Sequence, residues 1–317
     1  HFLFTGPHQS LRSFFHTVKP TLLKETEAIT KNMRKRGGGI VDIKLIDSTK
    51  NMANYYQLHV RFETADAMGA NFINSCLEQL AQTLQNEAAI YANFSETEKQ
   101  IEIVMSILSN YVPGSRVKAW VSCRIEELGD DGDVLAKKFV QAVEIAHHNN
   151  YRAVTHNKGI MNGVDALAIA TGNDFRAVDA GIHAYAGKDG NYRGLSRARI
   201  EKDVFWFELE IPLAVGTVGG LTKLHPLVQW SHQLLQNPNA KELMQVMAVS
   251  GLAQNFAALR SLVTTGIQKG HMKMHLLNIL NQMGATQPEK DAMIKHFTTN
   301  VVSFNAVEQA LAAWRKN

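Results

Sequence analysis

The chain has 317 residues, of which 45% are hydrophobic and 20% charged, a balance typical of a globular protein with a large core. A net charge of +4 is too small to indicate nucleic-acid binding, and the one short basic cluster, residues 31–36, is typical of a solvated helix end, with a phosphate-binding patch as the alternative. No run of 18 consecutive apolar residues occurs, and two cysteines make no disulfide framework. We therefore expect a cytoplasmic protein with no membrane and no nucleic-acid partner.

Six segments of the first third predict a small α+β domain. Residues 2–4, 40–45, 56–62 and 101–108 have the apolar runs or the alternation of strands, and residues 21–36 and 67–85 have helical spacing. The triple glycine at 37–39 is expected to end the first helix. The order strand, helix, strand, strand, helix, strand predicts a ferredoxin-like βαββαβ arrangement. The lack of a GxGxxG motif argues against a Rossmann dinucleotide fold.

The segment DAMGAN, residues 66–71, stands at the start of the second predicted helix. The N–H groups at a helix start attract phosphate, and Gly69 with Ala70 would let a pyrophosphate approach the backbone closely. The alternative is that Asp66 simply caps this helix, and the residue types alone favour the cap.

The middle of the chain predicts a larger mixed α/β domain. Strands are expected over residues 117–125 and 205–212, and helices over residues 134–148, 226–235 and 241–260. The glycine-rich VGTVGG, residues 215–220, lacks the Gly-Lys-Ser/Thr of a P-loop, so its glycines are expected to permit tight packing or a close backbone pass.

The stretch from Tyr151 to Ala177 contains an apolar run, residues 164–169, with polar residues gathered at its two ends. Lys158 precedes the run and Asp174 follows it, and we expect loops or a helix start to aim these side chains at a ligand. If the two ends converge, Lys158 and Asp174 share one pocket. The alternative is a loop, helix and loop with a surface lysine.

The tail carries GIQKGHMKMHLLN, residues 266–278, with His271 and His275 on one helix face. Zinc binding of the HExxH type requires a Glu where Met272 stands, so we expect no metal site. Nearby glycines could hinge a helical flap over residues 287–317, and a packed C-terminal hairpin is the alternative.

Four segments, DAMGAN, the stretch 151–177, PLAVGTVGGLTKLHP (212–226) and GIQKGHMKMHLLN, occur in the order found in 3-hydroxy-3-methylglutaryl-CoA (HMG-CoA) reductases. The chain resembles the soluble prokaryotic class II of this family over nearly its whole length, and the family's amino-terminal segment with its catalytic Glu has no match. The resemblance implies a dinucleotide-binding domain at 1–110, an HMG-CoA-binding domain at 111–262 and a helical flap at 263–317. It also implies a homodimer with a shared active site.

The resemblance assigns roles to individual residues. Lys158 would stabilise the oxygen that becomes negative as hydride arrives, Asp174 would hold Lys158 charged, and His271 would protonate the departing CoA thiolate. Arg152 would pair with the substrate carboxylate and Asn162 would hydrogen-bond its reacting end. The dinucleotide would lie against Asp66, Met68, Gly69, Asn71 and Asn110.

The resemblance also predicts the cofactor. NAD-using relatives carry an acidic residue about seven positions before the triple glycine, where this chain has Thr30 beside Lys31 and Arg34. Cations attract a 2′-phosphate that a carboxylate would repel, so we predict NADPH, with NADH possible. The expected reaction forms mevalonate and CoA from HMG-CoA. The alternatives are the reverse, NAD-linked reaction and a non-catalytic CoA-binding homologue.

Overall fold

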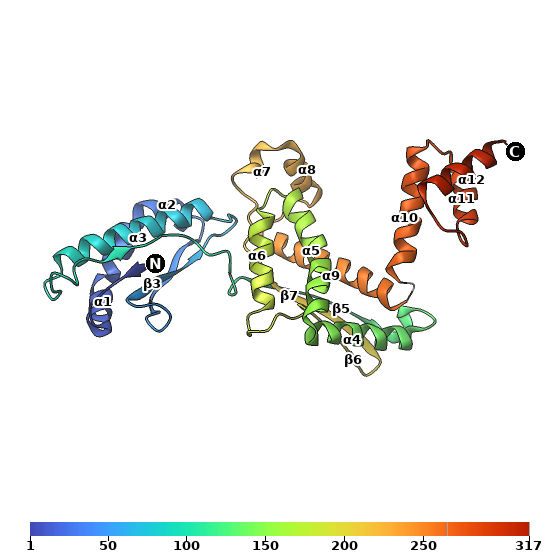
Figure 1. The fold of residues 1–317 in the computed structure, drawn as a ribbon. Coiled ribbons are helices and arrows are strands. Elements are labelled where there is room, and N and C mark those ends of the chain that lie inside the picture. The colour runs from blue at the N-terminus through green and yellow to red at the C-terminus, as the bar shows by residue number, and fades with distance from the viewer. Residues whose placement is uncertain (265, 317) are drawn as a thin grey trace. The chain divides into compact units, whose positions relative to one another are not determined.

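The computed structural model describes residues 1–264 and 266–316, with the side chains of 267–274 excepted. The chain divides into two compact units. Figure 1 labels the helices and strands along the chain. The first unit contains His1–Lys118, Val164–Lys188 and Glu210–Ala248, and the second contains Ala119–Gly163, Asp189–Leu209 and Val249–Asn317. Helices combine with two sheets whose described pairings are antiparallel, so the predicted α+β class is confirmed.

The amino-terminal part of the first unit is a four-stranded sheet with three helices. Its elements are β1 (Phe2–Leu3), α1 (His8–Glu25), α2 (Glu27–Arg34), β2 (Gly39–Asp47), β3 (Tyr55–Glu63), α3 (Ala70–Ile90) and β4 (Glu102–Ile103). The strand order is β2-β3-β1-β4, and each neighbouring pair is antiparallel. One apolar core joins strands to helices, with Phe2 and Tyr56 from the sheet, Phe14 from α1 and Leu80 from α3 all buried.

Three boundaries in this part differ from the sequence predictions. The helix expected over residues 21–36 begins at residue 8 and is divided into α1 and α2 at Thr26, whose hydroxyl donates to the carbonyl of Leu23 at 2.8 Å. The helix expected from residue 67 begins at Ala70, because Gly69 has a left-handed backbone (φ 85°) at its N-cap. The strand expected over 101–108 is only Glu102–Ile103, after which Val104 and Met105 both donate to the carbonyl of His1.

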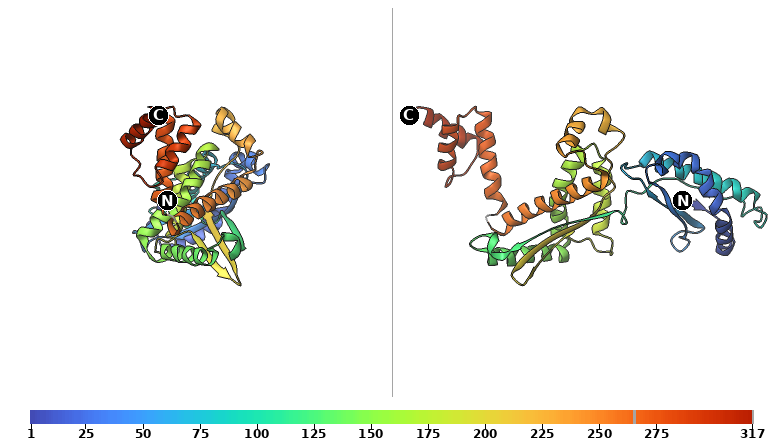
Figure 2. Two further views of the ribbon diagram at one scale, coloured as in Figure 1. Left: turned by 90° about the vertical axis from the view of Figure 1, so that its right-hand side faces the viewer. Right: turned by 180° about the vertical axis from the view of Figure 1, so that it is seen from behind.

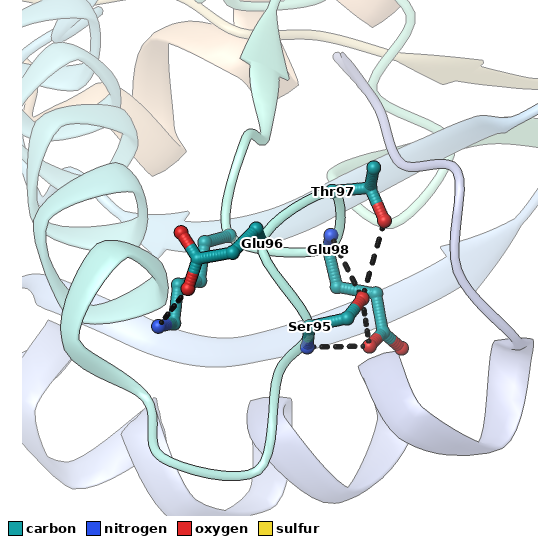
Figure 3. Close-up of polar contacts among 5 residues, drawn as sticks. Ser95, Glu96, Thr97 and Glu98 are labelled. Carbon is teal, nitrogen blue, oxygen red and sulfur yellow. Dashed lines mark hydrogen bonds and ion pairs between the residues drawn. The ribbon is translucent and has the colours of Figure 1, made fainter.

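A short turn at residues 95–99 returns the chain from α3 to β4. The backbone N–H and hydroxyl of Ser95 both donate to the Glu98 carboxylate, at 2.8 and 2.7 Å (Figure 3). These bonds hold the pKa of Glu98 below its ordinary value. Lys99 pairs with Glu96 at 2.8 Å. Local hydrogen bonds therefore help to fix the approach to the edge strand.

The rest of the chain forms a three-stranded sheet and the larger helices. Its order is β5 (Arg116–Arg124), α4 (Gly132–His148), α5 (Asn150–Ala170), α6 (Phe175–Ala186), β6 (Ser196–Glu201), β7 (Val204–Pro212), α7 (Leu221–Leu224), α8 (Pro226–Leu234) and α9 (Ala240–Val263). The sheet order is β5-β7-β6. The expected strand 205–212 is confirmed, and its alternation buries Phe205 and Phe207 against Phe139 of α4, with ring centroids 5.2 and 5.0 Å apart.

Residues 150–170 of the central stretch form one continuous helix, α5, so the expectation that Lys158 lies in a loop or at a helix start was wrong. The residues Ala153, Ile160, Val164 and Ala168 are all fully buried and recur at helical spacing, so one side of the helix is buried. Its glycines do not end it. At Gly163 an added Cβ would lie 2.6 Å from the Ser250 carbonyl oxygen of α9, so this glycine permits close contact of two helices.

The C-terminal helices α10 (Ile267–Gln282), α11 (Gln287–His296) and α12 (Phe304–Lys316) pack on one another (Figure 2). They share an apolar core of their own that includes Leu280, Met293 and Val307. Arg315 forms a two-pronged bond with Glu289, at 2.6 and 3.2 Å, and Glu289 also accepts from the Thr286 N–H at 2.6 Å.

The Glu289 carboxylate is expected to make this helical group sensitive to acid. Its pKa is lowered to about 2, first by the bond from Arg315 and then by the Thr286 N–H. A carboxyl group with a lowered pKa in the fold stabilises it above the ordinary value of about 4.3, and this stabilisation is lost as the pH falls towards 2. Glu289→Gln should therefore lower the protection of the α11 and α12 amides against hydrogen exchange at pH 6. Because the variant has no carboxylate to protonate, its protection should fall less than that of the wild type as the pH is lowered towards 2. Glu308→Gln, on the exposed side of α12, should behave as the wild type; an equal effect of both variants would contradict the assignment.

One helix among the described residues, α9, is long and apolar enough to cross a membrane by length and composition alone. A core helix of a water-soluble protein passes the same test, so this is weak evidence for a span. Along α9 the side chains of Leu243, Met247 and Leu259 are fully buried, and the polar Asn255 is buried among hydrogen-bond partners. Burial inside the protein accounts for only part of the apolar character of this helix, since 33% of its apolar window is buried.

Candidate functional site

Segments far apart in the sequence meet in the first unit. The carbonyl of Asp66 accepts from the N–H groups of Thr217 at 2.8 Å and Val218 at 3.3 Å, which ties DAMGAN to VGTVGG. At Gly216 an added Cβ would collide with the backbone nitrogen of Met68. The close backbone pass predicted for these glycines is therefore confirmed at Gly216, where no larger residue fits.

The Asp66 carboxylate caps a helix, but a different one from that expected. Its Oδ1 atom accepts from the N–H of Ala240 at 3.0 Å, and Ala240 is the first residue of α9. The start of α3, which Asp66 was expected to cap, has Gly69 as N-cap and no side-chain bond to it. The first N–H groups of α3 therefore have no side-chain cap, and an anion could accept hydrogen bonds from them.

Two cavities lie beside these segments. A small one, of about 50 Å³, is lined by Met68 and Asn110 together with residues of α6, so two of the predicted cofactor residues come together. A polar one, of about 550 Å³, is lined by Asp66 and Thr217 with residues of α7, α8 and the start of α9. A cavity of the second size falls in the range of about 300–1,000 Å³ that small-molecule ligands occupy. Gly69 and Asn71 lie at the uncapped start of α3, and the Asn71 side chain is exposed.

The predicted 2′-phosphate residues lie on α2. Thr30 is only 3% exposed, and its hydroxyl donates to the carbonyl of Glu27 at 3.3 Å. Lys31 and Arg34 are exposed, and Arg34 also lies 3.8 Å from the Glu27 carboxylate. Of the three predicted residues, only the two cations present their side chains at the surface.

Asp174 begins α6 as its N-cap. Its carboxylate accepts from the backbone N–H groups of Arg176 and Ala177, at 3.1 and 3.4 Å, and pairs with the Arg176 guanidinium at 3.2 and 3.3 Å. The bond from the Arg176 side chain is the main reason that the pKa of Asp174 lies below its ordinary value. The carboxylate is therefore ionised at neutral pH. Lys158 belongs to the second unit, and its predicted pairing with Asp174 stays a prediction.

The predicted substrate residues occupy α5. Lys158 and Asn162 are four positions apart on one helix face, and both side chains are exposed. Arg152 is half-buried, and this burial lowers its pKa. Lys158 thus has the accessibility that contact with a ligand requires, although it stands in mid-helix.

Two buried residues just before Lys158 anchor α5, and sequence reasoning missed both. The Asn157 amide donates to the Arg193 carbonyl at 2.8 Å and accepts from the Leu195 N–H at 2.9 Å. The His156 Nε2 atom lies 2.6 Å from the Ser196 hydroxyl. Burial, with smaller contributions from Arg152 and His147, lowers the pKa of His156 to about 3, so the imidazole is neutral.

His271 falls within the bounds of α10, and its side chain lies outside the described residues. The role predicted for it therefore stays a prediction. Among the described side chains, no group of three or more His, Cys, Asp or Glu could hold a metal ion.

Comparison with known proteins gives consistent matches. The profile of the family "Hydroxymethylglutaryl-coenzyme A reductase" matches residues 4–276. The 3-hydroxy-3-methylglutaryl-coenzyme A reductase of Archaeoglobus fulgidus is 39% identical over 262 residues, which is 82% of this chain and 56% of that protein. The probable reductase of Borreliella burgdorferi is 35% identical over 289 residues, 88% of this chain and 64% of that protein. The chain thus spans less than two thirds of the length of these relatives.

A solved structure agrees with the sequence matches. The class II 3-hydroxy-3-methylglutaryl-CoA reductase from Streptococcus pneumoniae, bound to NADPH in open conformations, aligns with a TM-score of 0.74 and 35% identity. The alignment covers 99% of this chain and 74% of that chain. The family resemblance predicted from the four ordered motifs is confirmed.

Proposed function

Because the chain belongs to the hydroxymethylglutaryl-coenzyme A reductase family, we propose that it reduces the thioester of HMG-CoA to mevalonate and CoA with two NADPH, as a step towards isoprenoids. The observation that carries this proposal is the convergence of DAMGAN, the turn TGND (residues 171–174) and VGTVGG. Hydrogen bonds join Asp66 to Thr217, and others join Asn173 to Gly216, across long stretches of sequence. These hydrogen bonds bring DAMGAN and VGTVGG to the border of one polar cavity, which Asp66 and Thr217 both line.

The first unit fits a nicotinamide dinucleotide. The uncapped start of α3 offers N–H groups to a pyrophosphate, and the cavity beside Asp66 has room for a small-molecule ligand. Asp66, Met68, Gly69, Asn71 and Asn110 would hold the dinucleotide, which supplies the hydride when it is bound. Lys31 and Arg34 would attract the 2′-phosphate of NADPH.

The chain's own residues would control charge at the reacting carbonyl. The exposed Lys158 ammonium would stabilise the oxygen that becomes negative as each hydride arrives. Asp174, ionised and held at a helix start, would keep that ammonium charged and oriented. Arg152 would bind the substrate carboxylate, Asn162 would hydrogen-bond the reacting end, and His271 would protonate the CoA thiolate.

We further propose that the protein is a homodimer in which a second copy completes the active site. The face of α5 that carries Lys158 and Asn162 also carries Tyr151, Val154 and Ile169, which are 91%, 54% and 59% exposed. Large apolar side chains beside polar functional ones are typical of a surface that a partner covers. A second copy seated there would exclude water from Lys158.

The same resemblance supports a domain division. We propose a ferredoxin-like dinucleotide domain at 1–110, an HMG-CoA domain at 111–262 and a helical flap at 263–317. The β2-β3-β1-β4 order and a core drawn from residues 2–103 support the first domain, and a separate core drawn from residues 276–311 supports the flap. Cys76 and Cys123 are both free, which agrees with a cytoplasmic location.

An assay of NADPH oxidation against HMG-CoA tests the main proposal. The protein expressed from its complete coding region should oxidise two NADPH for each HMG-CoA consumed and release one CoA. Binding of CoA without NADPH oxidation would instead indicate a non-catalytic homologue. Efficient turnover only in the direction of mevalonate oxidation with NAD⁺ would favour the reverse reaction.

The KM for NADPH is expected to lie below that for NADH, because Lys31 and Arg34 are exposed on α2. Charge reversal by Lys31→Glu together with Arg34→Glu should raise the KM for NADPH about tenfold or more and leave the KM for NADH nearly unchanged. Lys24→Glu, an exposed charge reversal at the end of α1, is the matched control. A lower KM for NADH in the wild type would contradict the assignment.

His271→Gln is expected to slow reduction of HMG-CoA at least about tenfold more than reduction of free mevaldehyde, because only the thioester releases a thiolate that needs a proton. Steady-state rates with each substrate measure the difference. His275→Gln, an exposed residue one turn later in α10, should leave both rates nearly unchanged. Equal losses on the two substrates would remove His271 from the thiolate step.

A further inference from the structure

The side chain of Asn173 forms both hydrogen bonds of a backbone pair with Gly216. Its Nδ2 atom donates to the Gly216 carbonyl at 3.1 Å, and its Oδ1 atom accepts from the Gly216 N–H at 2.8 Å. The two residues are 43 positions apart. An amide that satisfies the donor and the acceptor of one residue holds that residue in a single register, as a strand neighbour would.

The backbone of residues 216–218 is held equally closely on another side. The N–H groups of Thr217 and Val218 both donate to the Asp66 carbonyl. Gly216 lies so close to the backbone of Met68 that a Cβ atom would not fit between them. Asp66 lines the larger cavity together with Thr217 and Val218, whereas Met68 lines the smaller one. Residues 216–218 therefore connect Asn173 to the segment that borders both cavities.

The surroundings of the Asn173 Nδ2 atom admit only a hydrogen-bond donor. Besides the Gly216 carbonyl, the Thr171 hydroxyl lies 3.1 Å away and the Thr171 carbonyl 3.5 Å away. The hydrogen of that hydroxyl is already donated to the Leu167 carbonyl at 2.6 Å, so a lone pair faces Asn173. Three oxygen atoms thus surround one NH₂ group. An oxygen in its place would be repelled by the two carbonyl oxygens, and the Thr171 hydroxyl could donate to it only by giving up its bond to the Leu167 carbonyl.

We propose that Asn173 is a positioning residue for the dinucleotide, which it places by fixing residues 216–218 against Asp66 and Met68. This inference rests on the proposed function, because it takes the DAMGAN segment as the dinucleotide site. Asp174 follows Asn173 directly, so one turn holds both the carboxylate at the start of α6 and the loop that borders the cofactor. The binding of NADPH is thereby coupled to the conformation of the turn at residues 172–174.

The test is the equilibrium Kd of NADPH, measured by its fluorescence on the full-length protein. Asn173→Ala removes both bonds to Gly216 and should raise the Kd about tenfold, as the loss of one to two net hydrogen bonds does. Asn173→Asp keeps the size of the side chain but puts an oxygen among the three others, and should raise the Kd further than Asn173→Ala. If Asn173 only filled space, the Kd of NADPH would rise less in Asn173→Asp than in Asn173→Ala, because Asp is nearly isosteric with Asn.

Asn157→Ala is the matched control. It removes an amide that likewise bridges a backbone carbonyl and a backbone N–H, in the second unit. Its thermal midpoint should fall by a similar amount while the Kd of NADPH stays within about twofold of the wild type. An equal rise of the Kd in Asn157→Ala would show that lost stability, not the Gly216 contact, weakens binding.

Gly216→Ala tests the same backbone contact without changing Asn173. An added methyl group collides with Met68, so this variant should also raise the Kd of NADPH, whereas Gly187→Ala, where the nearest atom would be 3.7 Å away, should not. A wild-type protein that binds NADPH, with unchanged Kd values in Asn173→Ala and Gly216→Ala, overturns the inference alone. A wild-type protein that neither binds NADPH nor oxidises it overturns the proposed function as well.

Discussion

Lys158→Ala is expected to lower kcat for HMG-CoA by about 100-fold or more, because Lys158 is proposed to supply the cation that stabilises the developing oxyanion. The side chain is exposed on α5, so its removal creates no cavity and should leave the thermal midpoint almost unchanged. The loss should occur in both reduction steps, since each adds a hydride to a carbonyl carbon. Separate assays with HMG-CoA and with mevaldehyde would show it.

The control is Lys138→Ala on α4, which removes another exposed lysine from a helix of the second unit. Its turnover should match the wild type. Lys158→Arg keeps the charge but spreads it over a planar group, and should recover only part of the rate. Near-normal turnover of Lys158→Ala would exclude Lys158 from the mechanism.

Asp174→Asn is expected to lower turnover by about 100-fold while leaving the fold nearly as stable as before. Asn is as good an N-cap as Asp, so the bonds from the N–H groups of Arg176 and Ala177 to the side chain are retained. What is lost is the negative charge, which is proposed to keep Lys158 charged and oriented. Measuring both the thermal midpoint and kcat of Asp174→Asn against the wild type therefore separates a structural role of Asp174 from a catalytic one.

Arg176→Gln provides the comparison for Asp174. It breaks the exposed ion pair with Asp174 but leaves the carboxylate and its cap bonds, and exposed pairs contribute only about 0.2–1 kcal/mol. Its turnover should remain within about twofold of the wild type. If Asp174→Asn were as active as Arg176→Gln, Asp174 would serve α6 and not the reaction.

Local sequence patterns predicted the strands well where alternation or a turn marked them. The strand β7 follows the alternation of FWFELEIP, because residues on one face of a strand must all be apolar to join the core. Helix boundaries were less predictable. Gly69 stops α3 short of Ala67 through a positive φ angle, and Thr26, whose hydroxyl donates to the Leu23 carbonyl, divides one expected helix in two.

The arrangement of the predicted site residues could not be predicted from the sequence. The resemblance named Asp66, Asn110, Lys158 and Asp174 as expected site residues, yet nothing local indicates that Asp66 caps a helix 174 positions away. That the Asn173 side chain bonds to the Gly216 backbone could not be predicted from the sequence either. An amide side chain can bond to many backbone groups, and which one it meets depends on the path of the whole chain.

By itself, the sequence determined the family, the α+β class and the residues that carry charge, because these follow from residue types, their order and their local period. Only the tertiary structure decided that Lys158 stands in the middle of a continuous helix and that Asn173 holds Gly216 against Met68. The reason is physical: periodicity reports which side of an element is buried, whereas hydrogen bonds between distant segments depend on packing that no local pattern records.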